Sequence, residues 1–172
     1  MRLHIGGGME LEPTEGWKVF DVQPGPAVDF VGDCADLGRF ASDSVDEIYA
    51  SHVLEHLGYL EELPRTLQEF HRVLRKGGTA KISVPDFEVL ARMFLETSDV
   101  DERYHILRMI FGGQVDPFDY HYFGLTIDVL CQFLGNAGFT RVEKVEEFGL
   151  FKDSSAIRYQ GRLISLNVIA FK

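Results

Sequence analysis

Three consecutive glycines, Gly6–Gly8, follow a short apolar run. Each of the next two apolar runs has an aspartate at or just after its end, Asp21 and Asp33. Because glycine has no side chain, a ligand can approach the backbone of such a turn closely. Asp21 follows the glycines, and its carboxylate could accept hydrogen bonds from both hydroxyls of a sugar. Asp33 follows a third apolar run, where a carboxylate could accept a hydrogen bond from an amino group. These residues predict a site for a ligand that carries a sugar and an amino-bearing base.

Three kinds of glycine turn can hold such a ligand, and the residues after the turn distinguish them. A phosphate loop requires Gly-Lys-Ser/Thr, and the sequence does not contain that tripeptide. A dinucleotide turn follows G-x-G-x-x-G, and counting from Gly6 places Leu11 where the third glycine is required. A turn beneath the amino-acid end of S-adenosylmethionine needs glycines only where the cofactor meets the backbone. The turn therefore favours S-adenosylmethionine, with an NAD-dependent dehydrogenase as the alternative.

Histidines in two segments are candidates for proton exchange, because the unperturbed pKa of histidine lies near neutrality. The sequence SHVLEHL at 51–57 places His52 and His56 directly after an apolar run. The sequence GGQVDPFDYHYFG at 112–124 surrounds His121 with aromatic rings, and this histidine could take a proton from an acceptor hydroxyl. The structural alternatives are packed, hydrogen-bonded rings at 51–57 and a loop covering the sheet edge at 112–124. The sequence shows no spacing typical of metal ligands, so no metal is expected.

Alternating strands and helices must position these residues. Residues 60–74 repeat an apolar side chain every three or four positions, which predicts a helix with one buried face. The predicted strands are 3–5, 18–22, 28–31, 45–50, 80–84, 141–145 and 163–171, and the other predicted helices are 87–95 and 127–137. Such alternation predicts a doubly wound, mostly parallel α/β sheet. Ligands bind beyond the carboxyl ends of such strands, which is where the glycine turn would lie.

Bulk composition narrows the class of protein. The 172 residues are enough for one domain with a sizeable core. The net charge of −10, without an extended basic cluster, argues against a nucleic-acid partner. No apolar run approaches the ~20 residues that span a bilayer, and no signal segment precedes the glycines, so we expect no membrane association. Cys34 and Cys131 match no zinc or redox spacing, which is typical of reduced thiols and predicts a cytoplasmic protein.

Five blocks of sequence resemble, in order and spacing, the class I S-adenosylmethionine-dependent methyltransferases, in particular their type 11-like members. The blocks are LHIGGG at 3–8, GW followed by Asp21 at 16–21, GDCADL at 32–37, VDEIYASHVLEHL at 45–57 and FHRVLRKGGTAKISVPD at 70–86. The sequence LCQFLGNAGFTRVE at 130–143 resembles the late helix, turn and sixth strand of that family. The resemblance implies one domain over 1–172, with 99–124 as an acceptor-site or cap insertion. It also implies a Rossmann-like sheet of seven strands, with an antiparallel last strand and helices on both faces.

The resemblance implies roles for individual residues. The implied cofactor-binding residues are His4, Gly6, Gly7, Gly8, Asp21, Asp33, Cys34, Ser51 and His52. Asp21 would bind the ribose, Asp33 and the Cys34 backbone would contact adenine, and His52 would lie beside the reactive methyl. His4 departs from the family, which usually has an acidic residue at this position. The implied cofactor is S-adenosyl-L-methionine, and S-adenosyl-L-homocysteine is its product.

The activity expected from these observations is O-methylation of a small hydroxylated metabolite or sugar, with His121 and His52 as catalytic residues. A methyltransferase-like partner protein without catalysis is the alternative from another class. The segment between Gly8 and the second strand is too short for a full crossover helix. Because the first strand begins at residue 2 or 3, the N-terminal helices that often cover this site in the family are not expected. A homodimer could then cover the site.

Overall fold

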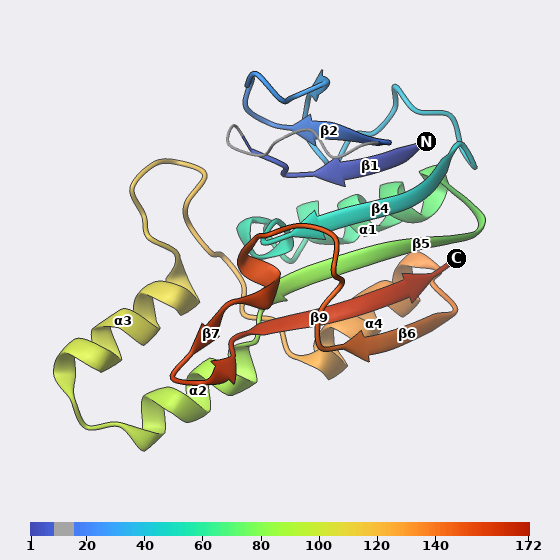
Figure 1. Cartoon of the computed structure of the whole chain (residues 1–172). Coiled ribbons are helices and arrows are strands. Elements are labelled where there is room, and N and C mark those ends of the chain that lie inside the picture. The colour runs from blue at the N-terminus through green and yellow to red at the C-terminus, as the bar shows by residue number, and fades with distance from the viewer. Residues whose placement is uncertain (9–15) are drawn as a thin grey trace.

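The fold is built around one sheet, as shown by a computed structural model that describes residues 1–8 and 16–172. Its seven strands lie in the order β3-β2-β1-β4-β5-β9-β6 (Figure 1). They are β1 Arg2–Ile5, β2 Trp17–Asp21, β3 Phe30–Val31, β4 Val45–Ser51, β5 Leu74–Pro85, β6 Arg141–Val145 and β9 Ser165–Phe171. The strands from β3 to β5 pair in parallel, and β9 runs antiparallel between β5 and β6. The predicted fold class, a mostly parallel Rossmann-like sheet with an antiparallel last strand, is confirmed.

Four helices and several short elements complete the described chain. The helices are α1 Glu62–Val73, α2 Phe87–Glu96, α3 Val100–Phe111 and α4 Ile127–Ala137. The short elements are the 3-10 turns η1 Leu54–His56 and η2 Ser154–Ala156 and the hairpin β7 Arg158–Tyr159 with β8 Arg162–Leu163. No helix among the described residues is long and apolar enough to cross a membrane. Three of the four helices match the predicted ones to within about two residues.

Helix α3 was not predicted, although its start carries a readable signal. Asp99 caps the helix by accepting a hydrogen bond from the Glu102 backbone N–H at 2.8 Å. An acidic cap followed three residues later by glutamate is a helix-start pattern. The helix buries only Ile106 fully, so its sequence shows little apolar periodicity. The prediction for the crossover after Gly8 falls mainly on residues 9–15 and lies outside the described residues.

The two faces of the sheet are covered differently. Helices α1 and α4 contact each other and both lie behind the sheet, where side chains such as Leu67, Phe70 and Leu134 form the main core (Figure 1). In front of the sheet, residues 146–157, including η2, cover β1 and β4. The sequence predicted helices on both faces of the sheet. Among the described residues, α1 and α4 cover one face, and residues 146–157 with the 3-10 turn η2 cover the other. Residues 22–29 join β2 to β3 without a helix, because they are few and include Pro24 and Pro26.

A buried tyrosine anchors this covering segment. Tyr49 is 0% exposed, and its hydroxyl donates a 2.6 Å hydrogen bond to Asp153 and lies 3.3 Å from the Ser155 hydroxyl. Asn167 donates from its side-chain nitrogen to the carbonyl oxygens of Glu146 and Ser155, both at 2.8 Å. The front face therefore holds its cover by specific polar contacts as well as by packing.

We expect Tyr49→Phe to lower the free energy of unfolding by about 1–2 kcal/mol, because it removes a buried hydrogen bond and leaves Asp153 without that donor. Chemical denaturation measures the change. Tyr59→Phe is the matched control, since Tyr59 is 49% exposed and lies away from the covering segment. Equal stability of the two variants would contradict the anchoring role of Tyr49.

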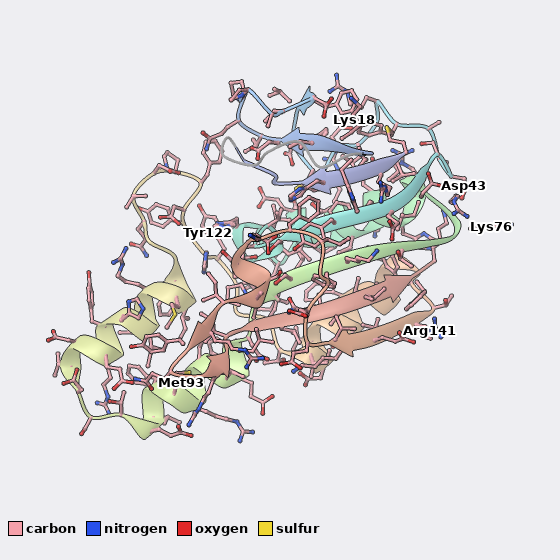
Figure 2. All side chains as sticks on the ribbon, in the orientation of Figure 1. Lys18, Asp43, Lys76, Met93, Tyr122 and Arg141 are labelled. Carbon is pink, nitrogen blue, oxygen red and sulfur yellow. The ribbon has the colours of Figure 1, made fainter. Side chains whose placement is uncertain are left out.

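Helices α2 and α3 form a separate pair beyond the end of β5, away from the sheet (Figure 1). Leu90 and Met93 of α2, Ile106 of α3 and Ile164 form a small second core between them. Figure 2 labels Met93 in this pair and Tyr122 near the same end of the sheet, whereas Asp43 and Lys76 lie at the opposite end. The α2–α3 pair is therefore positioned beside the edge at which parallel strands present ligand sites.

Candidate active site

A cavity of about 220 Å³ opens at the carboxyl ends of β1, β2 and β4. Gly6 and Asp21 line it from the strand ends, and His52, Val53 and His56 line it after β4. The remaining lining residues are Val22, Gln23, Pro117, Phe118, Tyr120 and Tyr122. The aromatic segment 112–124 thus folds over the predicted cofactor edge. It contributes to the cavity wall as well as covering the end of the sheet.

Gly6, the first residue of the glycine turn, lines this cavity and admits no larger residue. Gly6 has a φ of +71°, and a Cβ atom there would lie 2.4 Å from Cγ2 of Val53. A Cβ on Gly7 would lie 2.5 Å from Cγ1 of Val19. Gly8 has a φ of +67° and open space around its Cβ direction. The turn therefore presents bare backbone, which fits a cofactor that must lie against the chain.

Asp21 is fixed at the cavity rim by the backbone around it. Its Oδ2 accepts a hydrogen bond from the Gly8 N–H and its Oδ1 accepts one from the Gln23 N–H, both at 2.8 Å. Each carboxylate oxygen has a second lone pair, so both can still accept hydrogen bonds from a ligand. Asp21 is thus held with two accepting positions left over, and its predicted contact with a ribose stays a prediction.

Six predicted cofactor residues lie outside the cavity lining, namely His4, Gly7, Gly8, Asp33, Cys34 and Ser51. Asp33 is exposed, and its Oδ1 accepts a 2.8 Å hydrogen bond from the Ala35 N–H, which is the local turn that aspartate favours. Burial raises the pKa of Cys34 to about 11, and its sulfur lies 3.8 Å from the Thr66 hydroxyl. The Ser51 hydroxyl is buried and has no hydrogen-bond partner among the described residues. Adenine contacts by Asp33 and Cys34 therefore remain predictions.

His4, the departure from the family pattern, is a core residue in this fold. It is 2% exposed, and its ring packs against Tyr49 at 5.0 Å and Phe151 at 4.3 Å between ring centroids. Burial lowers its pKa to about 4, although Asp153 and Asp21 act in the opposite direction. His4 is not among the cavity-lining residues, so its predicted contact with the cofactor stays a prediction.

The buried neutral ring of His4 predicts a pH-dependent stability. Between about pH 6.5 and pH 4 the unfolded chain binds a proton at His4 that the folded chain does not, so acid favours unfolding. We expect this group to remove about 2 kcal/mol from the free energy of unfolding between pH 7 and pH 5. Denaturation across this range should show a smaller loss for His4→Phe, which keeps an aromatic ring. Parallel pH curves for both proteins would contradict the assignment to His4.

A second cavity of about 310 Å³ lies next to the first, between the sheet and the α2–α3 pair. Leu90 and Met109 line it from the two helices, and His121 lines it from the segment 112–124. The remaining lining residues are His52, Pro85, His105, Ser154, Ile157 and Ile164. Sequence reasoning missed the two α3 residues that line this cavity, His105 and Met109, because that helix was not predicted. Most of these side chains are apolar, so the cavity suits a small, largely desolvated molecule.

His52 lies where the two cavities meet, since it lines both. Its backbone has a φ of +55°, a conformation that is uncommon for residues other than glycine and is often found at functional sites. Its N–H donates a 2.8 Å hydrogen bond to the Ser83 carbonyl, which holds the turn against β5. The Nε2 atom lies 3.1 Å from the Ser165 hydroxyl, and Nδ1 lies 3.2 Å from Oε1 of Glu55.

His121 reaches the second cavity with a defined ring orientation. Its Nδ1 lies 3.2 Å from the Ile110 carbonyl oxygen, which can only accept, so Nδ1 carries the proton of the neutral ring. Partial burial is the main cause that lowers the pKa of His121, although Glu55 acts in the opposite direction. The ring is therefore neutral near pH 7, with a lone pair on Nε2. The fold thus brings His121 and His52 to one cavity, and their catalytic roles stay predictions.

Sequence comparison matches part of the chain to one family model. Residues 15–82 match the family model described as a methyltransferase domain. No curated protein matches the chain.

Solved structures identify the fold. A methyltransferase described as S-adenosylmethionine-dependent, from Archaeoglobus fulgidus, is 17% identical with a TM-score of 0.61, over 99% of this chain and 85% of that one. The protein described as a methyltransferase in complex with the Trm112 methyltransferase activator of Haloferax volcanii is 16% identical with a TM-score of 0.57, over 99% and 81%. The CurJ carbon methyltransferase is 18% identical with a TM-score of 0.56, over 98% of this chain and 47% of that one. This chain thus spans about half the length of CurJ.

The chain has the fold of the class I S-adenosylmethionine-dependent methyltransferases and carries a methyltransferase-domain sequence. The domain match and the structural neighbours imply S-adenosylmethionine as the cofactor. The geometry of the first cavity agrees, because bare backbone at Gly6 and the Asp21 carboxylate both line it.

Proposed function

We propose that this protein transfers a methyl group from S-adenosylmethionine to a hydroxyl of a small acceptor bound in the second cavity. The observation that carries the proposal is the meeting of the two cavities at His52. One cavity is lined by Gly6 and Asp21, and the other has an apolar wall with His121. A donor and an acceptor could thus be held on either side of His52, which is the orientation that methyl transfer needs.

When bound, S-adenosylmethionine supplies a methyl group on a sulfonium, so that a C–O bond forms as the C–S bond breaks and its electron pair stays on sulfur. Gly6 and Gly8 would support the amino-acid end, and Asp21 would hold the ribose. The hydroxyl proton of the acceptor must leave, and the Nε2 lone pair of His121 is oriented to accept it. Leu90, Met109 and Ile164 would exclude water from the acceptor.

Two measurements test this proposal. Calorimetric titration should show binding of S-adenosylhomocysteine and none of NAD, which separates a methyltransferase from a dehydrogenase. Turnover with radiolabelled S-adenosylmethionine should then be measured against a panel of sugars, phenols, amines, thiols and carbon acids. Methylation of hydroxyl compounds is the expected result. Methylation confined to amines, thiols or carbon would contradict the hydroxyl assignment, and cofactor binding without turnover across the panel would favour the non-catalytic partner protein.

We also propose that a second copy of this chain covers the outer surface of α3 and the segment that follows it. Val100 is 77% exposed, Tyr104 is 65% exposed and Val115 is 79% exposed, and such exposed apolar side chains support an interface. The Haloferax volcanii neighbour is a complex with an activator, so a different protein is the alternative occupant. Sedimentation should show a dimer at assay concentration, and a monomer throughout would contradict this proposal.

A further inference from the structure

Three side chains meet at the wall between the two cavities. Glu55 and His56 belong to η1, and His121 belongs to the segment 112–124. Each presents one possible metal-ligand atom, and these atoms all lie within 4.8 Å of one another. His56 lines the first cavity and His121 lines the second, so the cluster faces both. The Tyr122 N–H donates a 2.8 Å hydrogen bond to the Glu55 carbonyl, which holds the two segments together.

The two histidines of the cluster are oriented by backbone carbonyl groups. The Nδ1 atom of His56 lies 3.0 Å from the Tyr120 carbonyl oxygen, and that of His121 lies 3.2 Å from the Ile110 carbonyl oxygen. Because a carbonyl oxygen only accepts, each Nδ1 must donate, and each neutral ring then keeps a lone pair on Nε2. Histidines that bind metals are usually oriented in this way by a hydrogen bond from their other ring nitrogen.

Glu55 supplies a second, independent observation. It is 1% exposed, and neither of its carboxylate oxygens has a hydrogen-bond partner among the described residues. Burying a carboxylate without a partner is costly, so such a group calls for a compensating charge. Among the described residues, His52 alone has a side chain in ion-pair range of Glu55. Its Nδ1 lies 3.2 Å from Oε1 of Glu55, but the two atoms do not have hydrogen-bond geometry.

A neutral His52 does not donate a hydrogen bond to the Glu55 carboxylate. The Ser165 hydroxyl donates its one proton to the Ser154 carbonyl at 2.8 Å. It can therefore only accept from His52, and Nε2 of His52 must carry a proton. A neutral His52 then presents a lone pair on Nδ1 toward Glu55. A cation held beside Glu55 would compensate the charge of its carboxylate.

We propose that Glu55, His56 and His121 bind a divalent transition-metal cation at the junction of the two cavities. Two imidazoles and one carboxylate suit Zn²⁺, Fe²⁺, Co²⁺ or Mn²⁺ and leave coordination positions open. This inference rests on the proposed function, because the cation would lie beside the cavity proposed for the acceptor.

A cation at this position would change how the acceptor loses its proton. Coordination would lower the pKa of the acceptor hydroxyl, so its proton would pass to solvent as the acceptor enters the cavity, without requiring the Nε2 lone pair of His121. The oxygen would then form the C–O bond with the methyl group, while the C–S bond breaks and leaves its electron pair on sulfur. The reaction balances as an alcohol and a sulfonium giving an ether, a thioether and a proton.

Cobalt binding tests the site without depending on turnover. The full chain is treated with a chelator, and Co²⁺ is then titrated while its visible absorption bands are recorded. We expect one Co²⁺ per chain, displaced by Zn²⁺, and a rise in the thermal unfolding temperature. Glu55→Gln should weaken Co²⁺ binding by at least about 100-fold. Replacing a residue that only hydrogen-bonds a metal ligand already lowers metal affinity by about 10–100-fold. His71→Gln is the control, because His71 packs against Phe139, away from the cluster.

Each outcome decides the inference. Tight Co²⁺ binding that Glu55→Gln abolishes and His71→Gln preserves would support the site. No tight binding by the parent chain, or equal binding by the parent and Glu55→Gln, would overturn it. Folding of Glu55→Gln is checked by its unfolding temperature without metal, and His121→Asn gives a second test if that variant is unfolded. Titration with S-adenosylhomocysteine in the same preparation separates a failed metal site from a failed proposed function.

Discussion

Replacing His121 with alanine is expected to lower the maximal rate of methyl transfer by about 100-fold or more. His121 presents the Nε2 lone pair to the second cavity, with Nδ1 held by the Ile110 carbonyl. The loss is expected whether this lone pair accepts the acceptor's proton or binds a cation that activates the same oxygen. The measurement is kcat at saturating S-adenosylmethionine with the best acceptor of the panel.

Cofactor binding should separate this effect from damage to the site. His121 is not among the residues that line the first cavity, so S-adenosylhomocysteine should bind His121→Ala about as tightly as the parent protein. His71→Ala is the matched control and should keep its turnover, because His71 lies on α1 beside Phe139. Unchanged kcat in His121→Ala with intact cofactor binding would remove this residue from the mechanism.

Asp21→Asn is expected to weaken S-adenosylhomocysteine binding by about 100-fold, or about 2.7 kcal/mol. Hydrogen bonds to a charged group contribute about 1.5–3 kcal/mol, and the ribose would form its bonds with this carboxylate. Asparagine also turns one accepting oxygen into a donor, which faces either the Gly8 or the Gln23 N–H. Calorimetric titration measures the change.

The control for this variant keeps the same chemical change at a distant position. Asp43 is exposed at the opposite end of the sheet, where its carboxylate accepts a hydrogen bond from Lys172 (Figure 2). Its φ of +58° is a conformation that asparagine tolerates, so Asp43→Asn should bind S-adenosylhomocysteine like the parent protein. Equal affinity of the Asp21→Asn and Asp43→Asn variants would show that Asp21 does not hold the cofactor.

Local patterns in the sequence determined most of the fold. Apolar periodicity placed α1, α2 and α4, and the alternation of strands and helices predicted the parallel sheet. The glycine turn could also be found from sequence, because the φ of +71° at Gly6 and its close approach to Val53 leave no alternative residue. Helix α3 was missed because it buries little, so burial imposes little periodicity on its residues.

The sequence by itself predicted S-adenosylmethionine as the ligand, from the pattern of the glycine turn, from Asp21 and from the resemblance to a methyltransferase family. The tertiary structure alone decided what surrounds that ligand. It placed His4 in an aromatic core and brought Glu55 and His56 against His121. The physical reason is the sequence separation of the interacting residues. Periodicity and backbone conformation depend on residues that are near neighbours in the chain. Contacts between η1 and the segment 112–124 depend on strand order and on hydrogen bonds between segments far apart in sequence.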